Sequence, residues 1–433
     1  MSDYSKSQEY VLEKVWFYCL GGRYEGKGLL TWEAERGFHI EAPVSRMGKP
    51  LPDRIELGKA GVLTRHDAIT MRMRLTTGEI AVAPNIFFRP NLRLLHENHL
   101  SITLKRVLFV NHWPFANASE WWGGSALYKT CEELILPDTV NRKVTIGNEE
   151  VESGHAAAGI LHKDDRIDLS GRQVDADHLE LSWNLSKADW TKAESWRWAE
   201  EAQHALAILS GQTIRLVRRK TYRSIGTNTV EYTEIRKQNE PELLLDILCP
   251  IKKRMPFDKN AFVKMTEFLA RNPERGKICR KIFYQIADAS RQRTWQGREL
   301  LLSTILEAAL RTLYGQPFQP GVYSWPVEEY LEKFRQDFLT VKWQDACRRV
   351  LEVQKRLRHR NAHPDWLSDE GGSESKAEME QSVDDMVFLS SFYGYMIMAI
   401  AGFKDVEPSF PKPHKEWRPS LTIEQHPQPK ATG

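Results

Sequence analysis

Residues 343–366 read WQDACRRVLEVQKRLRHRNAHPDW. Apolar side chains recur in this stretch at steps of three and four residues, which is the spacing of one buried face of an α-helix. They are Trp343, Ala346, Cys347, Val350, Val353 and Leu357. Because Pro364 disfavours helical geometry at the residue before it, we expect the helix to end near His363. The stretch therefore predicts a helix of an all-α domain, with arginine and histidine side chains gathered at its end.

The polar residues at this helix end have a chemistry that suits cleavage of phosphodiester bonds in RNA. They are Arg356, Arg358, His359, Arg360, Asn361 and His363. An imidazole with an ordinary pKa of about 6.5 can accept or donate a proton near neutral pH. A guanidinium binds a phosphate through two parallel hydrogen bonds and opposes the negative charge of the transition state. RNA brings its own nucleophile, the 2′-hydroxyl, so we expect neither a metal nor a cofactor.

A structural explanation competes with this one. Basic residues are favoured in the last turn of a helix, where they face the negative end of the helix dipole. The cluster would then stabilise the helix or contact an anion without any catalysis.

The motif resembles the Rx4–6H motif of HEPN-domain ribonucleases. In this comparison Arg358 is the arginine, His359 is the polar residue beside it, and His363 is the histidine. The resemblance implies that Arg358 holds the scissile phosphate and that His363 performs acid–base catalysis, with His359 or Asn361 orienting it. The family more often has asparagine at the position of His359. Arg356 also fits the motif, because six residues separate it from His363. The choice among Arg356, Arg358 and Arg360 therefore stays open.

The size and composition of the chain are those of a globular protein of two or three domains. It has 433 residues, 41% hydrophobic and 27% charged. A net charge of +3 is too small to predict a nucleic-acid partner, so any basic surface must be local. The five cysteines are far apart and form no CxxC pair, which favours a reducing compartment without disulfides or a zinc site.

One apolar stretch has the length of a membrane span. Residues 386–403 contain no charged side chain, but they include serine, glycine and tyrosine and follow the acidic pair Asp384 and Asp385. We expect a helix buried in an all-α core. The polar first residues contain no apolar signal core, so we expect a cytoplasmic protein that contacts no membrane.

The first 235 residues predict a β-rich domain of sandwich type, so that the whole chain belongs to the α+β class. Short runs of β-branched and aromatic residues are separated by glycine and proline. The expected strands are Val11–Leu20, Lys27–Ala34, Gly37–Val44, Ile69–Leu75, Ser101–Asn111 and Leu179–Leu185. One helix, Ala193–Leu209, interrupts them and ends before Gly211, as helices commonly do.

A glycine-rich segment in this domain imitates a nucleotide-binding loop. Gly21, Gly26 and Lys27 satisfy the Gly-x4-Gly-Lys part of a P-loop. Gly28 stands where a serine or threonine would bind magnesium, and residues 29–32 continue as a strand instead of a helix. We expect a hairpin here; a P-loop switch protein stays an alternative that would bind ATP or GTP through Lys27.

Two further features of the β-rich half allow a functional and a structural reading. Seven tryptophans could stack on nucleic-acid bases or fill a sheet core: Trp113, Trp121, Trp122, Trp183, Trp190, Trp196 and Trp198. A basic run could follow a phosphate backbone or protect an exposed edge strand: Arg215, Arg218, Arg219, Lys220 and Arg223. The histidines His96, His99, His155 and His162 have no metal-ligand spacing.

Residues 240–405 predict an all-α domain. Amphipathic stretches indicate helices at Asp258–Asn272, Lys277–Ala289 and Trp295–Tyr314, then a helical region from Pro326 to Arg356. In the third helix, Glu307 and Arg311 are four residues apart and can pair as ordinary surface residues. The HEPN resemblance implies instead that they support the active site. Residues 406–433 contain six prolines and form a tail that we do not expect to pack into a core.

The complete layout is similar to the ApeA family of anti-phage HEPN proteins. The run Val15-Trp-Phe and the run Gly26-Lys-Gly-Leu-Leu resemble the start of that family's N-terminal domain. The resemblance implies a HEPN-like helical bundle and a latent endoribonuclease that acts in abortive infection. It also implies a homodimer through the helical domain, an RNA substrate with tRNA as one candidate, and a phage-derived trigger bound by the N-terminal domain. The alternative is a HEPN protein that binds RNA or a protein partner without catalysis.

Overall fold

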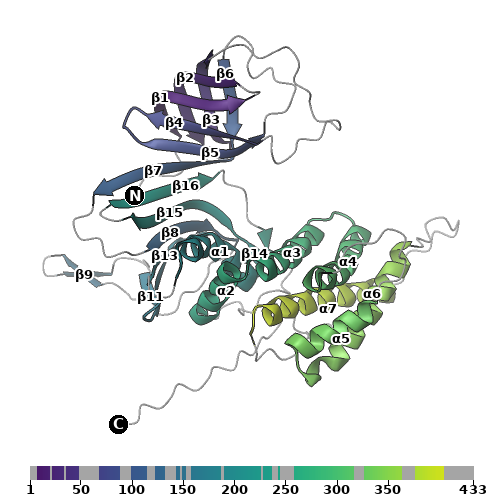
Figure 1. The fold of residues 1–433 in the computed structure, drawn as a ribbon. Coiled ribbons are helices and arrows are strands. Elements are labelled where there is room, and N and C mark those ends of the chain that lie inside the picture. Colours follow the sequence, from purple (N-terminus) through teal and green to yellow (C-terminus); the bar gives the residue numbers. More distant parts are fainter. Residues whose placement is uncertain are drawn as a thin grey trace. The chain divides into compact units, whose positions relative to one another are not determined.

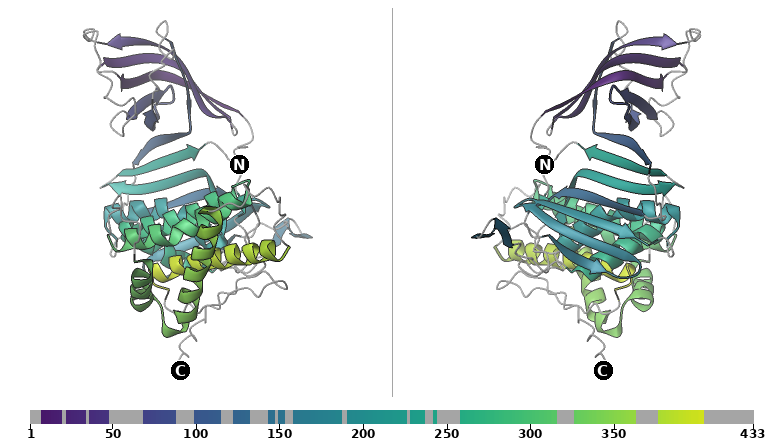
Figure 2. Two further views of the ribbon diagram at one scale, coloured as in Figure 1. Left: turned by 90° about the vertical axis from the view of Figure 1, so that its right-hand side faces the viewer. Right: turned by 90° about the vertical axis from the view of Figure 1, so that its left-hand side faces the viewer.

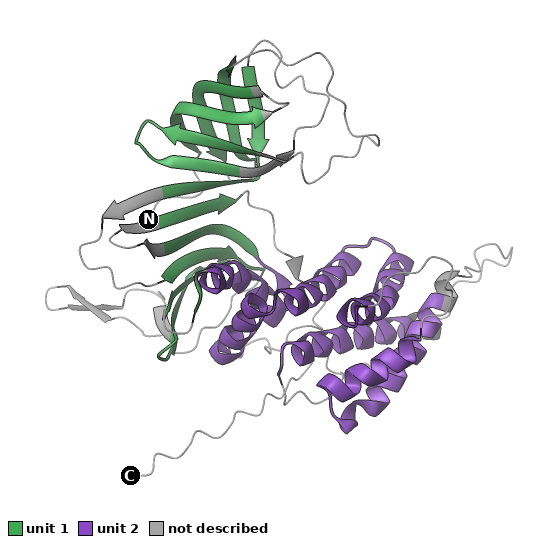
Figure 3. Cartoon of the chain, viewed as in Figure 1, with its two compact units in different colours: residues 1–133, 138–191, 215–241 green, residues 134–137, 192–214, 242–433 purple. Residues whose placement is uncertain are grey.

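The computed structural model of the chain contains two compact units, one of strands and one mainly of helices (Figures 1 and 3). The first comprises residues 1–133, 138–191 and 215–241, and the second comprises residues 134–137, 192–214 and 242–433. The structure describes residues 7–19, 22–33, 36–47, 68–87, 99–114, 122–131, 143–146, 149–152, 158–186, 190–225, 228–236, 242–243, 258–315, 326–362 and 376–403. The chain is thus of the α+β class, as the sequence predicts.

The strand unit is built around one antiparallel sheet of 13 strands (Figures 1 and 2). The order in the sheet is β11-β12-β13-β8-β15-β16-β7-β5-β4-β1-β2-β3-β6. The bounds are β1 Gln8–Cys19, β2 Gly22–Glu33, β3 Gly37–Met47, β4 Ala68–Leu75, β5 Ile80–Phe87, β6 His99–Leu104, β7 Arg106–Pro114, β8 Trp122–Lys129, β11 Ala158–Lys163, β12 Ile167–Asp175, β13 His178–Leu185, β15 Arg215–Ile225 and β16 Asn228–Arg236. A small hairpin joins β9 Lys143–Ile146 to β10 Glu149–Glu152, and β14 Gln212–Thr213 pairs with β17 Glu242–Leu243.

The predicted sandwich of separate sheets is wrong among the described strands, because this sheet curls over itself. Strands β1 to β7 share one hydrophobic core, to which Ile235 of β16 also belongs. Phe109 of β7 lies 5.2 Å from Tyr10 of β1 and 6.1 Å from Phe38 of β3, between ring centroids, although neither strand is its neighbour in the sheet. The predicted strand Ser101–Asn111 is broken at Lys105, where the chain passes from one side of the core to the other. Alternating polarity reports a buried face, but not which strand pairs with which.

The glycine-rich segment forms a hairpin of β1 and β2, in which Cys19 pairs with Gly22. Gly26, Lys27 and Gly28 lie within β2, where a P-loop would begin a helix. Side chains at Gly26 and Gly28 would collide with backbone oxygens of Pro43 and Glu41 in the adjacent strand. The two glycines therefore permit close contact between strands, and the P-loop interpretation is not supported.

The tryptophans and the basic run are mostly structural where their side chains are described. Four of the seven tryptophans are buried in the protein: Trp122, Trp183, Trp190 and Trp198. The basic run lies on β15, which is a central strand between β8 and β16, so the alternative of an exposed edge strand is wrong. Arg218 pairs with Glu180 at 3.3 Å, Arg219 with Glu234 at 2.5 Å, and Lys220 with Glu231 at 3.3 Å. Acids that are distant in the sequence thus account for three of these cations.

The described helices agree with the sequence in approximate position, but the single helical region predicted from Pro326 to Arg356 contains two α-helices and a 3-10 turn. They are α1 Lys192–Ser210, α2 Lys259–Arg271, α3 Pro273–Ser290, α4 Trp295–Leu313, α5 Val327–Phe338, the 3-10 turn η4 Val341–Trp343, α6 Gln344–Ala362 and α7 Lys376–Ile400. Asp258 caps α2 by accepting the amide of Ala261, and Thr294 caps α4 by accepting that of Gly297. α3 begins at Pro273, earlier than predicted, because proline is favoured in the first turn of a helix.

The placement of α1 differs from the predicted division of the chain. The sequence placed this helix inside a domain of residues 1–235, whereas it clusters with the helices. Arg197 of α1 donates to the backbone oxygen of Ala270 at 3.0 Å, and Arg280 of α3 pairs with Glu201 at 2.6 Å. Gly211 follows the helix with a φ of 65°, as the predicted helix end requires. The predicted tail, residues 406–433, lies outside the described residues.

The apolar stretch near the C-terminus is a buried helix. α7 is the one described helix that is long and apolar enough to cross a membrane, over Glu380–Ile400, and 83% of its most apolar window is buried inside the protein. Its apolar side chains contribute much of the core of the helical unit. This burial agrees with the prediction of a core helix.

Candidate functional site

The candidate site lies on α6, and the structure describes part of it. The predicted apolar stripe from Trp343 to Leu357 is buried in full, which fixes the rotation of the helix. Gln354 on the same helix donates to the backbone oxygen of Ser303 on α4 at 2.7 Å. α6 is described to Ala362; His363 lies outside the described residues, as do the side chains of His359, Arg360 and Asn361. Arg356 and Arg358 are therefore the candidate residues of the motif whose contacts can be compared.

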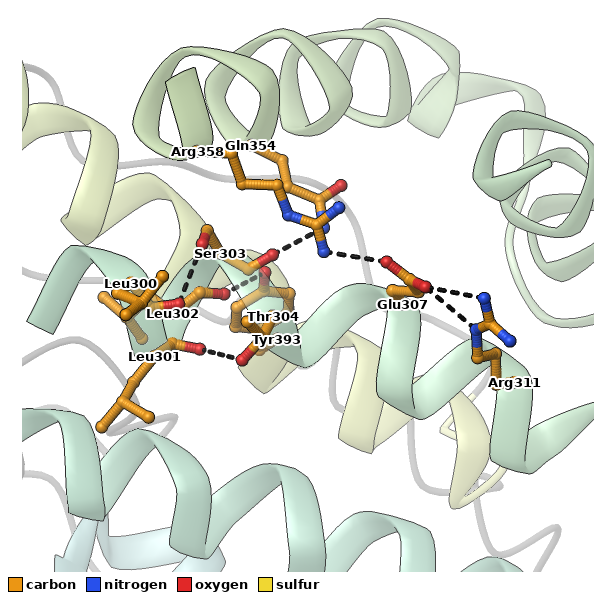
Figure 4. A network of polar contacts seen from close by, with 10 residues as sticks. All are labelled: Leu300, Leu301, Leu302, Ser303, Thr304, Glu307, Arg311, Gln354, Arg358 and Tyr393. Atoms are coloured by element: carbon orange, nitrogen blue, oxygen red, sulfur yellow. Dashed lines mark hydrogen bonds and ion pairs between the residues drawn. The ribbon is translucent and has the colours of Figure 1, made fainter. Parts of the chain in front are cut away.

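Arg358 is held by Glu307, one member of the pair that the sequence singled out on α4 (Figure 4). The Oε2 atom of Glu307 accepts a hydrogen bond from Nη2 of Arg358 at 2.9 Å. The Oε1 atom of Glu307 accepts from Nε of Arg311, also at 2.9 Å. One carboxylate thus joins two guanidinium groups, which leaves this group of three side chains with one net positive charge. The structure places Glu307 in contact with Arg358 and places Arg311 next to Glu307.

The Glu307 carboxylate stays ionised in this setting. Partial burial would by itself raise the pKa of Glu307, but the hydrogen bonds and charges of Arg358 and Arg311 outweigh it and lower that pKa. The side chain of Glu307 is 23% exposed, so water screens the two ion pairs only in part. Glu307 is therefore a fixed anion that orients Arg358 at neutral pH.

We expect Glu307→Gln to lower the free energy of unfolding by about 1–2 kcal/mol at neutral pH, because charged hydrogen bonds are lost. Since the folded pKa of Glu307 is lowered, its stabilising effect is present above the ordinary carboxyl range and is lost as the pH falls through the folded pKa. Urea unfolding of both proteins at several pH values measures this. A stability difference that stays constant down to pH 3 would contradict the assigned ion pairs.

Arg356 has a different partner and a different role. Its Nε and Nη2 atoms donate to both carboxylate oxygens of Asp385 on α7, at 2.7 and 2.8 Å. Gln381, one turn earlier on α7, donates to the same carboxylate at 2.9 Å. The Asp385 side chain is 0% exposed, so this two-pronged ion pair compensates a buried charge and ties α6 to α7.

The two arginines therefore differ in the donors they have left. Arg356 uses the fork that would bind a phosphate on Asp385. Arg358 uses Nη2 for Glu307, and its Nε and Nη1 atoms make no hydrogen bond to any residue that the structure describes. Its side chain is 41% exposed. Arg356 is 45% exposed, so the two arginines differ in the number of N–H groups left for an oxyanion and not in exposure.

Sequence reasoning missed the polar residues that support this region from α4 and α7. Tyr393 donates to the backbone oxygen of Leu302 at 2.8 Å beside Arg358 (Figure 4), and Ser382 contacts the buried Glu299 and accepts from Trp295. Asp385 was noted only as one of an acidic pair before an apolar run. Asp385 directly precedes an apolar run that must be buried. A carboxylate in that position needs a cation as its partner, so the sequence did contain a signal for Arg356 or another basic residue.

Another group of described residues has the spacing of metal ligands, away from the motif. Asp175, Asp177 and His178 lie at the turn between β12 and β13, with ligand atoms within 4.8 Å of one another. Nδ1 of His178 lies 2.8 Å from an oxygen of each aspartate, and Lys129 lies 3.9 Å from Asp177. Internal hydrogen bonds and this lysine explain the cluster, so we assign no metal to it.

Comparisons with known proteins add no relative. No family model, curated protein or solved structure matches this chain.

Proposed function

We propose that this protein is a HEPN-type endoribonuclease that cleaves RNA at the end of α6 without a metal. The observation that carries the proposal is that two arginines two residues apart, Arg356 and Arg358, have different partners and use different numbers of hydrogen-bond donors. Arg356 pairs with the buried Asp385 through both Nε and Nη2, whereas Arg358 is oriented by Glu307 through Nη2 alone and keeps more of its N–H groups for a phosphate. The positions of α4, α6 and α7 support reading the helical unit as a HEPN-like bundle.

Each motif residue has a proposed role in this reaction. Arg358 binds the scissile phosphate and opposes the charge that develops on its oxygens. His363 removes the proton of the 2′-hydroxyl or returns one to the leaving 5′-oxygen. The 2′-oxygen bonds to phosphorus as the bond to the 5′-oxygen breaks, which leaves a 2′,3′-cyclic phosphate and a free 5′-hydroxyl. His359 or Asn361 orients His363, and Arg360 adds positive charge for the RNA backbone.

Glu307 and Arg311 are positioning residues in this proposal. Glu307 restricts the Arg358 side chain, which lowers the entropy lost when a phosphate binds. Arg311 neutralises the second oxygen of Glu307, so that carboxylate does not cancel the charge of Arg358. Together, Glu307 and Arg311 hold Arg358 in place while the three side chains keep one net positive charge.

The wider biological role follows from the resemblance to anti-phage proteins. We propose a cytoplasmic homodimer in which two motifs meet across a two-fold axis and form one composite site. The strand unit would bind a phage-derived trigger or restrain the nuclease until infection. Cleavage of cellular RNA, with tRNA as a candidate, would then stop growth.

The direct test uses purified protein, labelled RNA and a chelator. We expect the wild type to release products with cyclic phosphate ends, and His363→Ala to be slower by about 10²–10⁴-fold, the usual contribution of a general acid or base. Mass spectrometry of the products identifies their ends. Equal cleavage by wild type and His363→Ala would reject the assignment of His363.

The second candidate is an RNA-binding or partner-docking HEPN protein without catalysis. Its support is that Arg356 and Arg358 both pair with acids, as in an ordinary basic helix end. Such a protein would bind RNA with a strong salt dependence and yield no cut ends under any condition.

A further inference from the structure

We infer that the outer face of β1, β2 and β4 binds single-stranded RNA. The surface, which we call the outer patch, consists of Lys14, Trp16, Tyr18, Arg23, Arg72 and Arg74. The inference deepens the proposed function and rests on it only for the choice of RNA over DNA. The patch lies in the strand unit and contains no residue of the motif on α6.

Strand alternation places the outer patch on the face away from the core, where Tyr18, Arg72 and Arg74 are exposed and Lys14, Trp16 and Arg23 are half-buried. Val15 and Phe17 of β1 and Met73 of β4 are buried in the shared core. The residues between them point to the opposite face of the sheet. Tyr18 is 64% exposed, which is unusual for a large aromatic side chain.

The register of the strands mixes aromatic rings with cations. Trp16 lies opposite Arg72, and Lys14 lies opposite Arg74, across the pairing of β1 with β4. On the other side Tyr18 lies opposite Arg23 of β2. Directly opposed side chains are about 5 Å apart at Cβ, so each ring has a cation beside it. The guanidinium of Arg23 lies 6.0 Å from the Tyr18 ring, and the ammonium of Lys14 lies 5.8 Å from the Trp16 ring.

The outer patch keeps uncompensated positive charge. Glu25 on β2 pairs with Lys14 at 2.9 Å and contacts Arg23, so it neutralises one of these two cations. Arg72 and Arg74 are exposed and form no ion pair with any residue in the described ranges. This differs from β15, where acids of neighbouring strands pair with the arginines. The unpaired charge favours an anionic partner.

The combination of exposed rings and cations favours a single strand over a duplex. Single-stranded nucleic acids bind to open sheets by stacking unpaired bases on aromatic side chains while cations contact the backbone. Trp16 and Tyr18 are two residues apart on one face, about 6.6 Å along the strand. That is roughly twice the ~3.4 Å between stacked nucleotides, so two separated bases can each meet a ring. Bases inside a duplex are not available for this contact.

The test measures binding of a fluorescein-labelled, mixed-sequence 12-nucleotide single strand with 2′-O-methyl groups to the full-length protein. This probe cannot undergo the proposed cleavage, so failure of the ribonuclease proposal does not affect the result. Trp16→Ala and Tyr18→Ala are each expected to raise Kd about 5- to 100-fold without changing its salt dependence. Arg72→Gln with Arg74→Gln is expected to lower the slope of log affinity against log salt by about 1.4.

Two control variants are matched to these changes. Val11→Ala removes an exposed apolar side chain from the same strand, and Arg36→Gln removes an exposed cation from the turn after β2; both should bind like the wild type. Thermal unfolding confirms that each variant is folded. The inference is overturned if the wild type does not bind the probe, or if it binds a duplex of the same sequence as tightly. It is also overturned if the patch variants retain wild-type affinity, which would leave the exposed rings to a protein partner.

Discussion

Arg358→Ala is expected to reduce the rate of RNA cleavage by about 10²–10³-fold, the usual effect of removing a group that stabilises transition-state charge. Arg358→Lys should recover only part of the rate, because an ammonium cannot form the two parallel hydrogen bonds of a guanidinium. The fold should persist, since the Arg358 side chain is 41% exposed and its described partner is Glu307 alone. Single-turnover cleavage assays and urea unfolding of the same preparations measure both properties.

Arg311→Ala separates positioning from phosphate binding, because Arg311 acts on Arg358 only through Glu307. It removes the other guanidinium bound to Glu307, from a helix outside the motif, and should change the cleavage rate by less than about tenfold. A wild-type rate for Arg358→Ala, together with a large loss for Arg360→Ala, would move the catalytic arginine to Arg360. A loss in Arg356→Ala without any loss of stability would instead assign catalysis to Arg356.

Arg356→Ala is expected to lower the free energy of unfolding by about 2–4 kcal/mol at neutral pH. The change leaves the carboxylate of Asp385, which is 0% exposed, with Gln381 as its described hydrogen-bond partner. We place the value below that of a fully buried pair because the Arg356 side chain is 45% exposed. Adding Asp385→Asn to Arg356→Ala removes the buried charge and should restore part of the lost stability. Denaturant unfolding of the single and double variants forms the required cycle.

Lys355→Ala provides a neighbouring control on the same helix. Lys355 also forms an ion pair, with Glu328 at 2.8 Å, but both side chains are largely exposed, at 73% and 65%. We expect a change of less than about 0.5 kcal/mol. Equal effects of Lys355→Ala and Arg356→Ala would show that Asp385 does not depend on Arg356, and would remove the basis for separating Arg356 from Arg358.

Local sequence patterns predict the helical regions and part of the sheet, but they missed the strands β5, β8, β11, β12 and β16. The apolar stripe of α6 and the end of α1 at Gly211 follow from spacing and backbone preference. These features depend on residues within a few positions of one another. Pairing between segments that are distant in the sequence cannot be predicted from such local patterns. For this reason the single curled sheet and the position of α1 among the helices were not predicted.

The candidate site shows the same limit. Its cations were recognisable on one helix, but their partners lie on two others: Glu307 on α4 and Asp385 on α7. Glu307 was identified through the resemblance, whereas Asp385 was not identified as a partner. The alternation of β1 and β4 indicates that Trp16 and Arg72 face away from the core, but only the register places them side by side. The proposed site and the outer patch both depend on such long-range pairings.

The most direct measurement of the central claim compares total RNA from cells that carry the wild type or His363→Ala, before and after phage challenge. Sequencing of RNA 3′ ends would locate any cuts and report their terminal groups. We predict new ends with cyclic phosphate after challenge in the wild type alone, together with loss of phage protection in His363→Ala. Protection that survives in His363→Ala, with no new RNA ends in either strain, would contradict the ribonuclease.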